Sequence, residues 1–308
     1  MPLMRPLLLA LSQHPGCRNA VENWSLGHRL SSRFVAGTEA VAALKVVEQL
    51  NSQGFAASLD YLGENVLNEN EACRTGETYH SLLDAIGKRG LNSHISIKLT
   101  QLGLDLDFGL ARQIVGALAR HAAQIGSFVR VDMEGSTYTQ ATLDLVQDVH
   151  KEQPCNGHIG VVIQSYLRRS AEDVADLLRH GIRIRLCKGA YAESPDIAFP
   201  RKLEVDANYL SLAQLLLGSE SFHAFATHDH RIIREIQRIA QLQGIASDRF
   251  EFQMLYGIRR DLQSAIVKEG HRMRVYVPFG TAWYPYFMRR LAERPANVVF
   301  LAKNILRS

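Results

Sequence analysis

The sequence lacks closely spaced cysteines. Its 308 residues include four cysteines, Cys17, Cys73, Cys155 and Cys187. They form neither a CxxC motif nor the ligand spacing of a zinc site, which argues against a structural zinc module. Isolated cysteines of this kind are typical of reduced thiols in the cytoplasm.

Long apolar runs are also missing, and no stretch has the length that a transmembrane helix needs. The apolar run near the start covers only residues 7–11, with no small-residue cleavage site after it, so no secretory signal is predicted. We expect a cytoplasmic protein. Residues 1–50 are interpreted as an N-terminal helical segment, and residues 51–308 as the catalytic domain. A peripheral contact of the segment with the inner face of a membrane stays open.

No charge of one sign dominates any part of the chain. The net charge is +4, and basic and acidic residues are interspersed, so a nucleic-acid partner is not expected. A Walker loop and a GxGxxG motif are both absent, which gives no support to a dinucleotide-binding Rossmann unit.

From about residue 55 the sequence alternates short β-branched runs with longer segments of helical periodicity. Eight such units in about 250 residues predict an α/β fold of the (βα)₈ TIM-type barrel class. The strands are expected to begin near residues 56, 94, 128, 158, 183, 222, 250 and 273. The helices are expected at 71–88, 108–124, 140–151, 171–179, 207–217, 231–243, 261–268 and 283–306.

Polar residues share one phase within several of these strands. Ser96 and Lys98 alternate with apolar residues, as do Arg130 and Asp132. In a barrel the apolar phase faces the helices and the polar phase faces the lumen. Polar groups late in the strands should then meet at the C-terminal mouth. These are Lys98, Asp132, Gln164, Arg185, Lys188, Thr227, His228 and Gln253.

The last predicted helix carries an unusual set of residues. Tyr286, Arg289, Arg290 and Glu293 are three or four positions apart and share one face. Two adjacent guanidinium groups repel each other unless an anion binds between them, and a carboxyl group such as Glu293 can hold one of them in place. With Lys98, Arg185 and Lys188 the mouth gains an excess of positive charge over its carboxylates, chiefly Asp132, Glu134 and Glu64, which indicates an anionic ligand.

Three other readings of these residues stay open on the sequence alone. His228 and His230 form an HxH pair, but no matching ligand set stands at the other strand ends, so no metal ion is expected. Lys98 or Lys188 could form a Schiff base, as in a barrel lyase or aldolase. A barrel that only binds an anionic metabolite is the third alternative.

Seven segments together resemble the proline dehydrogenase family, in the order of that family and each at an expected strand end. They are SIKLTQLG at 96–103, VRVDMEGS at 129–136, VIQSYLRRS at 162–170, RLCKGAY at 185–191, ATHD at 226–229, FQMLYGIR at 252–259 and YVPFGTAWYPYFMRRLAERPAN at 276–297.

This resemblance implies an FAD-dependent enzyme that oxidises L-proline to Δ1-pyrroline-5-carboxylate, the first step of proline degradation to glutamate. A hydride passes from proline C5 to flavin N5, and the electrons then pass to a membrane quinone. The implied fold is a distorted barrel whose last helix lies over the mouth. Since no aldehyde dehydrogenase domain follows residue 308, a separate pyrroline-5-carboxylate dehydrogenase is expected downstream.

The resemblance also implies roles for individual residues. Asp132 and Arg185 are expected in catalysis, with Arg185 at flavin N5. Glu64 is expected to orient Arg289 through an ion pair, and the bulk of Tyr276 favours proline over hydroxyproline. The expected proline-binding residues are Lys98, Tyr276, Tyr286, Arg289 and Arg290. The expected FAD-binding residues are Met133, Gln164, Arg185, Lys188, Gly189, Ala190, Thr227 and His228.

Overall fold

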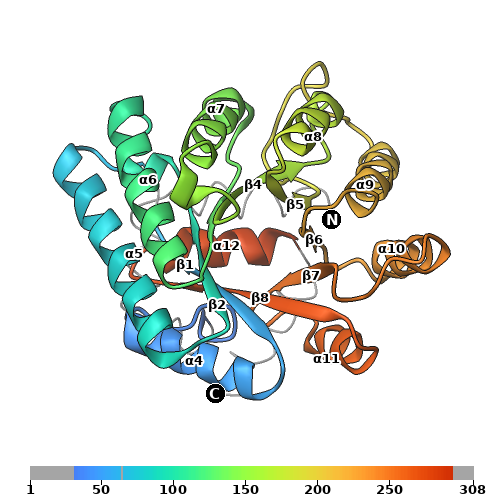
Figure 1. Cartoon of the computed structure of the whole chain (residues 1–308), viewed down its shortest axis with the longest axis horizontal. Coiled ribbons are helices and arrows are strands. Elements are labelled where there is room, and N and C mark those ends of the chain that lie inside the picture. The colour runs from blue at the N-terminus through green and yellow to red at the C-terminus, as the bar shows by residue number, and fades with distance from the viewer. Residues whose placement is uncertain (1–30, 64, 294–308) are drawn as a thin grey trace.

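Eight parallel strands close into a barrel in the order of the sequence in the computed structural model (Figure 1). The structure describes residues 31–63 and 65–293, without the side chains of residues 289 and 291–293. The strands are β1 Ala56–Tyr61, β2 Ser93–Ile97, β3 Val129–Val131, β4 Ile159–Gln164, β5 Arg183–Cys187, β6 His223–Ala226, β7 Phe250–Leu255 and β8 Arg272–Phe279. The predicted barrel class is therefore confirmed.

The helices form a ring outside the strands (Figure 1). They are α4 Ala40–Ser52, α5 Glu69–Arg89, α6 Phe108–Gln124, α7 Thr139–His150, α8 Ser170–Arg179, α9 Lys202–Leu217, α10 His230–Leu242 and α11 Arg260–Lys268, with α12 Trp283–Glu293 inside the ring. The helix expected from residue 207 begins at Lys202, because Arg201 and Glu204 form a capping box that the apolar periodicity does not reveal. The helix expected at 283–306 is described only as far as Glu293.

The alternation of apolar and polar residues places the main core between the strands and the surrounding helices. Leu59, Ile97, Val131, Val161 and Ile184 point outward from their strands and are fully buried. Burial of each such side chain stabilises the fold by about 1.5–3 kcal/mol. The strand residues of the opposite phase face the lumen, where polar and charged side chains gather.

Two helices depart from the regular ring. Helix α4 packs against β1 and β8, and its Ala43, Leu44 and Val47 belong to the main core. Helix α12 instead crosses the middle of the ring (Figure 1). Its apolar side chains pack with Leu62, which follows β1, and with Ile258, which follows β7, in a second cluster. Both contacts lie at the carboxyl ends of strands, so α12 covers the mouth of the barrel, as expected.

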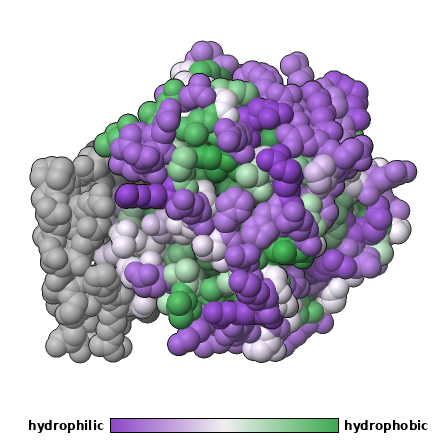
Figure 2. All heavy atoms as spheres, turned by 60° about the vertical axis from the view of Figure 1, so that its left-hand side comes forward, coloured by the Kyte–Doolittle hydropathy of each residue, from purple (hydrophilic) through white to green (hydrophobic). Residues whose placement is uncertain are grey.

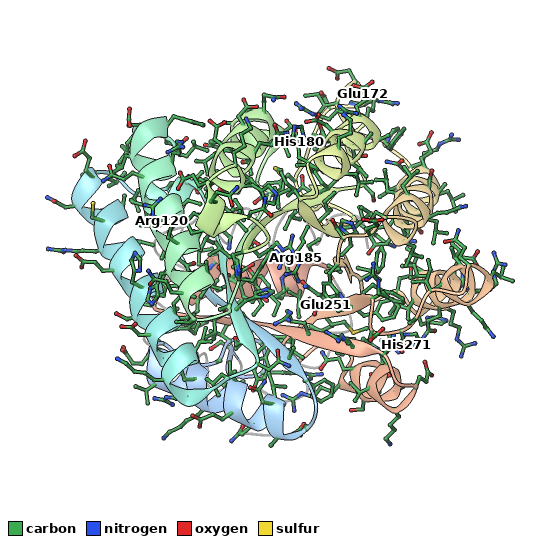
Figure 3. The ribbon with its side chains drawn as sticks, viewed as in Figure 1. Arg120, Glu172, His180, Arg185, Glu251 and His271 are labelled. Carbon is green, nitrogen blue, oxygen red and sulfur yellow. The ribbon has the colours of Figure 1, made fainter. Side chains whose placement is uncertain are left out.

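Charged residues fill the lower lumen, where each needs a partner because burial of an unpaired charge is costly. Arg274 Nε donates to Glu251 Oε1 at 2.8 Å. Arg130 donates to the carbonyl oxygens of Val161 and Arg183, at 2.9 and 2.6 Å. Figure 3 shows Arg185 and Glu251 inside the ring of strands, away from the surface helices.

The outer surface is largely hydrophilic. Figure 2 shows polar side chains over most of the face that carries α5 and α6, with apolar side chains gathered in several groups between them. Among the described residues, no helix combines the length and the apolar character needed to cross a bilayer.

The loop that joins β5 to α9 is fixed to its neighbours by specific contacts. Gly189 has a φ of +99°, and a Cβ at this position would lie 2.1 Å from the ring of Tyr166. Glu193 accepts hydrogen bonds from the backbone N and the Oγ of Ser136, at 2.8 and 2.6 Å. The loop is therefore anchored to the segments that follow β3 and β4.

We predict that Gly189→Ala lowers the free energy of unfolding by about 2–5 kcal/mol, the sum of the strained backbone and the clash with Tyr166. Gly181→Ala is the matched control, because Gly181 also has a positive φ of 69° but no atom within 4 Å of the added Cβ. The control should lose only about 1–2 kcal/mol. Equal losses in urea unfolding would contradict the role of the Tyr166 contact.

His223 makes the fold sensitive to acid. Its Nδ1 accepts a hydrogen bond from the backbone N of Ile184 at 3.0 Å, and its Nε2 lies 2.7 Å from Ser219 Oγ. Burial, with the nearby charges of Arg130 and Arg183, lowers the pKa of His223 from 6.5 to about 3.

Between these pH values the unfolded chain binds a proton at His223 that the folded chain does not, so stability falls as the pH falls. We predict a contribution of up to about 1.4 kcal/mol per pH unit below pH 6.5. Urea unfolding between pH 6.5 and pH 5 measures the slope, and His223→Asn should have the shallower one. A variant with the same slope as the parent would contradict the assignment.

Candidate active site

An ion pair between Asp132 and Arg185 occupies the upper lumen. Asp132 follows β3, Arg185 lies in β5, and Arg185 Nη2 donates to Asp132 Oδ1. Ser96 Oγ donates to the same oxygen at 2.8 Å, and Tyr276 Oη donates to Asp132 Oδ2 at 2.7 Å. Four strands or strand ends thus contribute to one cluster, at the place where the sequence predicts that polar groups converge.

The surroundings of Asp132 keep it ionised. Burial is the largest influence on its pKa and acts to raise it, but the charges of Arg185 and Lys98 and the hydrogen bonds from Tyr276 and Ser96 bring the pKa below the usual value. The guanidinium of Arg185 also lies over the ring of Tyr276, 5.3 Å from its centroid.

Lys98 joins this cluster to a second carboxylate. Lys98 Nζ donates to Asp60 Oδ1 at 2.9 Å and lies 3.5 Å from Asp132 Oδ2 and 3.4 Å from Tyr276 Oη. Burial acts to lower the pKa of Lys98, but the charges of Asp60, Tyr276 and Asp132 raise it well above the usual value. Lys98 is therefore a fixed cation next to the mouth.

The sequence analysis missed Asp60 as a site residue. It lies in β1 beside Ser96 of β2 and Pro278 of β8, and its side chain is fully buried. The available signal was a carboxylate inside a mostly apolar strand, two residues after Ser58 and therefore in the same phase. Glu134, expected among the carboxylates of the mouth, instead accepts from the N and Oγ1 of Thr100, at 3.1 and 2.7 Å.

A row of hydrogen bonds continues below Arg185. Arg185 Nη1 lies 3.4 Å from Gln253 Oε1, and Gln253 Nε2 donates to Glu251 Oε1 at 2.6 Å. Glu251 then accepts from Arg274. Hydrogen bonds through Gln253 therefore link the Asp132–Arg185 ion pair to the Glu251–Arg274 ion pair. Glu251 and Arg274 were not singled out from the sequence, although both share the inward phase of their strands.

Lys188 lies on the rim above β5 between two carboxylates. Its Nζ is 2.6 Å from Asp206 Oδ1 and 3.2 Å from Asp229 Oδ2. Thr227 Oγ1 accepts from the backbone N of Asp229 at 3.1 Å, and His228 Nε2 accepts from the backbone N of Leu255 at 3.0 Å. Within residues 31–63 and 65–293, no group of three or more potential metal ligands is present.

Gln164 closes the same rim at the end of β4. Its Nε2 donates to the backbone oxygen of Met133 at 3.3 Å. Both residues belong to the expected FAD-binding set. Its Oε1 is buried and has no hydrogen-bond partner among the described residues. This rim is therefore built at the ends of three neighbouring strands. Gln164 ends β4, the loop with Gly189 and Ala190 follows β5, and the turn with Thr227 and His228 follows β6.

Helix α12 brings aromatic and basic residues over the mouth. Tyr286 is buried, and the guanidinium of Arg290 lies 5.1 Å from the centroid of its ring. Glu64 and the side chains of Arg289 and Glu293 lie outside the described residues. The predicted roles of these three residues remain predictions.

The lyase alternative is not favoured by the two candidate lysines. A lysine that forms a Schiff base must be available as the neutral amine. Lys98 has its pKa raised, and Lys188 is held in two ion pairs.

Comparisons with known proteins agree with this geometry. The family model described as proline dehydrogenase matches residues 43–303. Proline dehydrogenase 1 of Bacillus subtilis (strain 168) is 42% identical over 306 residues, covering 99% of this chain and 100% of the relative. Proline dehydrogenase of Deinococcus radiodurans is 37% identical, covering 99% of this chain and 98% of the relative.

Among solved structures, proline utilization A (PutA) from Bdellovibrio bacteriovorus, inactivated by N-propargylglycine, aligns with a TM-score of 0.82 and 28% identity. The alignment covers 87% of this chain and 33% of that chain, so this chain spans about a third of the PutA protein. The chain belongs to the proline dehydrogenase family, whose members are oxidoreductases that act on proline.

Proposed function

We propose that this protein oxidises L-proline to Δ1-pyrroline-5-carboxylate with bound FAD and passes the electrons to a membrane quinone. The observation that carries the proposal is the cluster of Arg185, Asp132, Lys98 and Tyr276 below α12. It offers fixed positive charge for a carboxylate and a buried guanidinium next to the place where a substrate enters.

The rim formed after β4, β5 and β6 fits a flavin nucleotide. Gln164 Oε1 is a buried acceptor without a partner in the described structure, which a ring N–H of the cofactor would satisfy. Lys188 would bind a phosphate, with the backbone of Gly189 and Ala190 beside it, and Met133, Thr227 and His228 would complete the site. When bound, the flavin supplies the hydride acceptor.

The substrate would bind between the strand ends and α12. Lys98 and Arg290, with Arg289, would hold the carboxylate of proline, and Tyr276 and Tyr286 would enclose its ring. In this proposal Glu64 and Glu293 orient the two arginines.

The main contribution of the protein is to position the reacting groups. A charged clamp that fixes the ring in one orientation replaces a bimolecular encounter with an intramolecular step. Asp132 holds the guanidinium of Arg185 in place, and Ser96 and Gln253 prevent it from rotating. The apolar cluster under α12 excludes water from the same space.

In this proposal the product passes to another enzyme and the electrons pass to a membrane quinone. A quinone resides in the membrane, so the reaction would take place in the cytoplasm at the inner face of that membrane. A separate dehydrogenase would oxidise the product further.

We predict that the purified protein is yellow and that the flavin absorption bleaches when L-proline is added without oxygen. The reason is that the two-electron reduction of flavin removes its visible band. An absorption spectrum before and after addition provides the measurement. A protein that stays colourless after FAD is supplied would overturn the proposal.

We predict that Lys98→Met keeps its flavin but raises the KM for proline by roughly 30- to 4,000-fold, as expected when one partner of a buried charge pair is removed. Steady-state kinetics measures the change. Lys202→Met is the matched control, since Lys202 is 71% exposed and pairs with Asp206. Covalent trapping of the parent protein at Lys98 by borohydride with a carbonyl substrate would instead support the lyase alternative.

A further inference from the structure

Asp60 is a buried carboxyl group whose two oxygens have different surroundings. Its side chain is fully buried, one oxygen accepts from Lys98, and no hydrogen bond reaches Oδ2 from the described residues. A carboxylate oxygen that is both buried and without a partner is costly, because it has lost its water and gained nothing in return. Such an atom needs an explanation, and protonation would remove the cost.

The proposed reaction releases a proton that the site must accept. Proline in neutral solution carries a protonated secondary amine. Removal of one proton from nitrogen and one hydride from carbon gives a protonated imine. The amine must lose this proton before its carbon can release a hydride. The side chains of Lys98 and Asp132 are each only 11% exposed, and a buried side chain beside them can act as the first acceptor.

Asp132 is poorly suited to this task. Its Oδ1 accepts from Arg185 and Ser96, and its Oδ2 accepts from Tyr276 with Lys98 nearby. These donors stabilise the ionised form and hold the pKa of Asp132 below its usual value. Asp132 therefore serves as a permanent negative charge that keeps Arg185 in position.

Asp60 has the opposite surroundings. The groups that face it are Lys98 of the β2 end, Asp132 of the β3 end, Tyr276 of β8 and Tyr79 of α5. Burial is the largest cause that raises the pKa of Asp60, and the negative charge of Asp132 adds to it, against the lowering effect of Lys98 and Tyr276. Two neighbouring carboxyl groups whose pKa values are moved in opposite directions are the usual mark of an acid-base pair.

We propose that Asp60 accepts the proton that leaves the amine of proline, and that Lys98 relays it. This inference rests on the proposed function. A proton of Lys98 first passes over 2.9 Å to Asp60 Oδ1. The neutral Nζ then accepts the proton of the substrate amine, so that one N–H bond breaks in the substrate and one forms at Lys98. The lysine ends as it began, Asp60 becomes a neutral carboxylic acid, and the electron pair of the C–H bond leaves with the hydride to the flavin.

The first test compares the rate of flavin reduction by proline in the parent and in Asp60→Asn, without oxygen, between pH 7 and pH 10. At pH 7 the variant should be slower by about 10²–10⁴-fold, the usual contribution of a positioned base. The deficit should shrink by at least about tenfold by pH 10, because solvent then removes the proton from the amine. Binding of cyclopentanecarboxylate, which has no amine, should be unchanged.

Asp173→Asn provides the control. Asp173 is also a buried carboxylate, but it lies on α8 and pairs with Arg169 at 2.9 Å. It should reduce flavin at the parent rate. A deficit of Asp60→Asn that is equal at every pH, or a variant as fast as the parent at pH 7, would overturn the role of Asp60. A parent protein that proline does not bleach would overturn the proposed function itself.

A second measurement keeps the inference testable if Asp60→Asn does not fold. Infrared difference spectra of the parent, recorded as proline reduces the flavin, should show the C=O band of a newly protonated carboxyl group. In Asp60→Glu the band should move, because the carboxyl group changes from aspartic to glutamic acid. No band, or a band at the same position in both proteins, would overturn the inference.

Discussion

The constraint on which this structure depends is that charge inside a closed barrel must be compensated there. The lumen of a small barrel is filled by side chains and is cut off from bulk water. Here the inward positions of β2, β5, β7 and β8 carry Ser96, Arg185, Glu251 and Arg274, and hydrogen bonds link these from the mouth to the floor. The contacts that compensate the buried charges therefore also hold the reactive groups in position.

Such a core ties the precision of the site to the register of the sheet. Arg185 meets Asp132 because both strands are held at a fixed offset through β4, which lies between them. A slip of one residue would turn every charged side chain of a strand toward the apolar helices. The cost of that error is far larger than in a barrel with an apolar lumen, so the buried charges select one register.

Much of this arrangement follows from the sequence. The strands begin within one residue of the expected positions, because their apolar phase is strong, and the polar phase of β2, β3 and β5 faces the lumen as expected. Lys98, Asp132, Arg185 and Tyr276 were named as site residues from the sequence motifs. The buried carboxylates that support them, Asp60 and Glu251, were not. The inward phase of Asp60 and Glu251 indicated that they face the lumen but not which residues they contact, since their partners lie on or directly after the next strand, 38 and 23 residues further along the chain. Lys188 was counted in the excess positive charge of the mouth, but it pairs with Asp206 on α9, a carboxylate that was not among those expected there.

The two irregular helices cover different parts of the barrel. Helix α4, which precedes the first strand, covers the outer face where β8 meets β1. Helix α12 packs in a cluster that is separate from the main core. The wall of the barrel and the cover of its mouth are thus built from opposite ends of the described chain. A displacement of α12 to admit a substrate would leave the main core closed. Opening of the mouth would therefore not reduce the stability of the barrel.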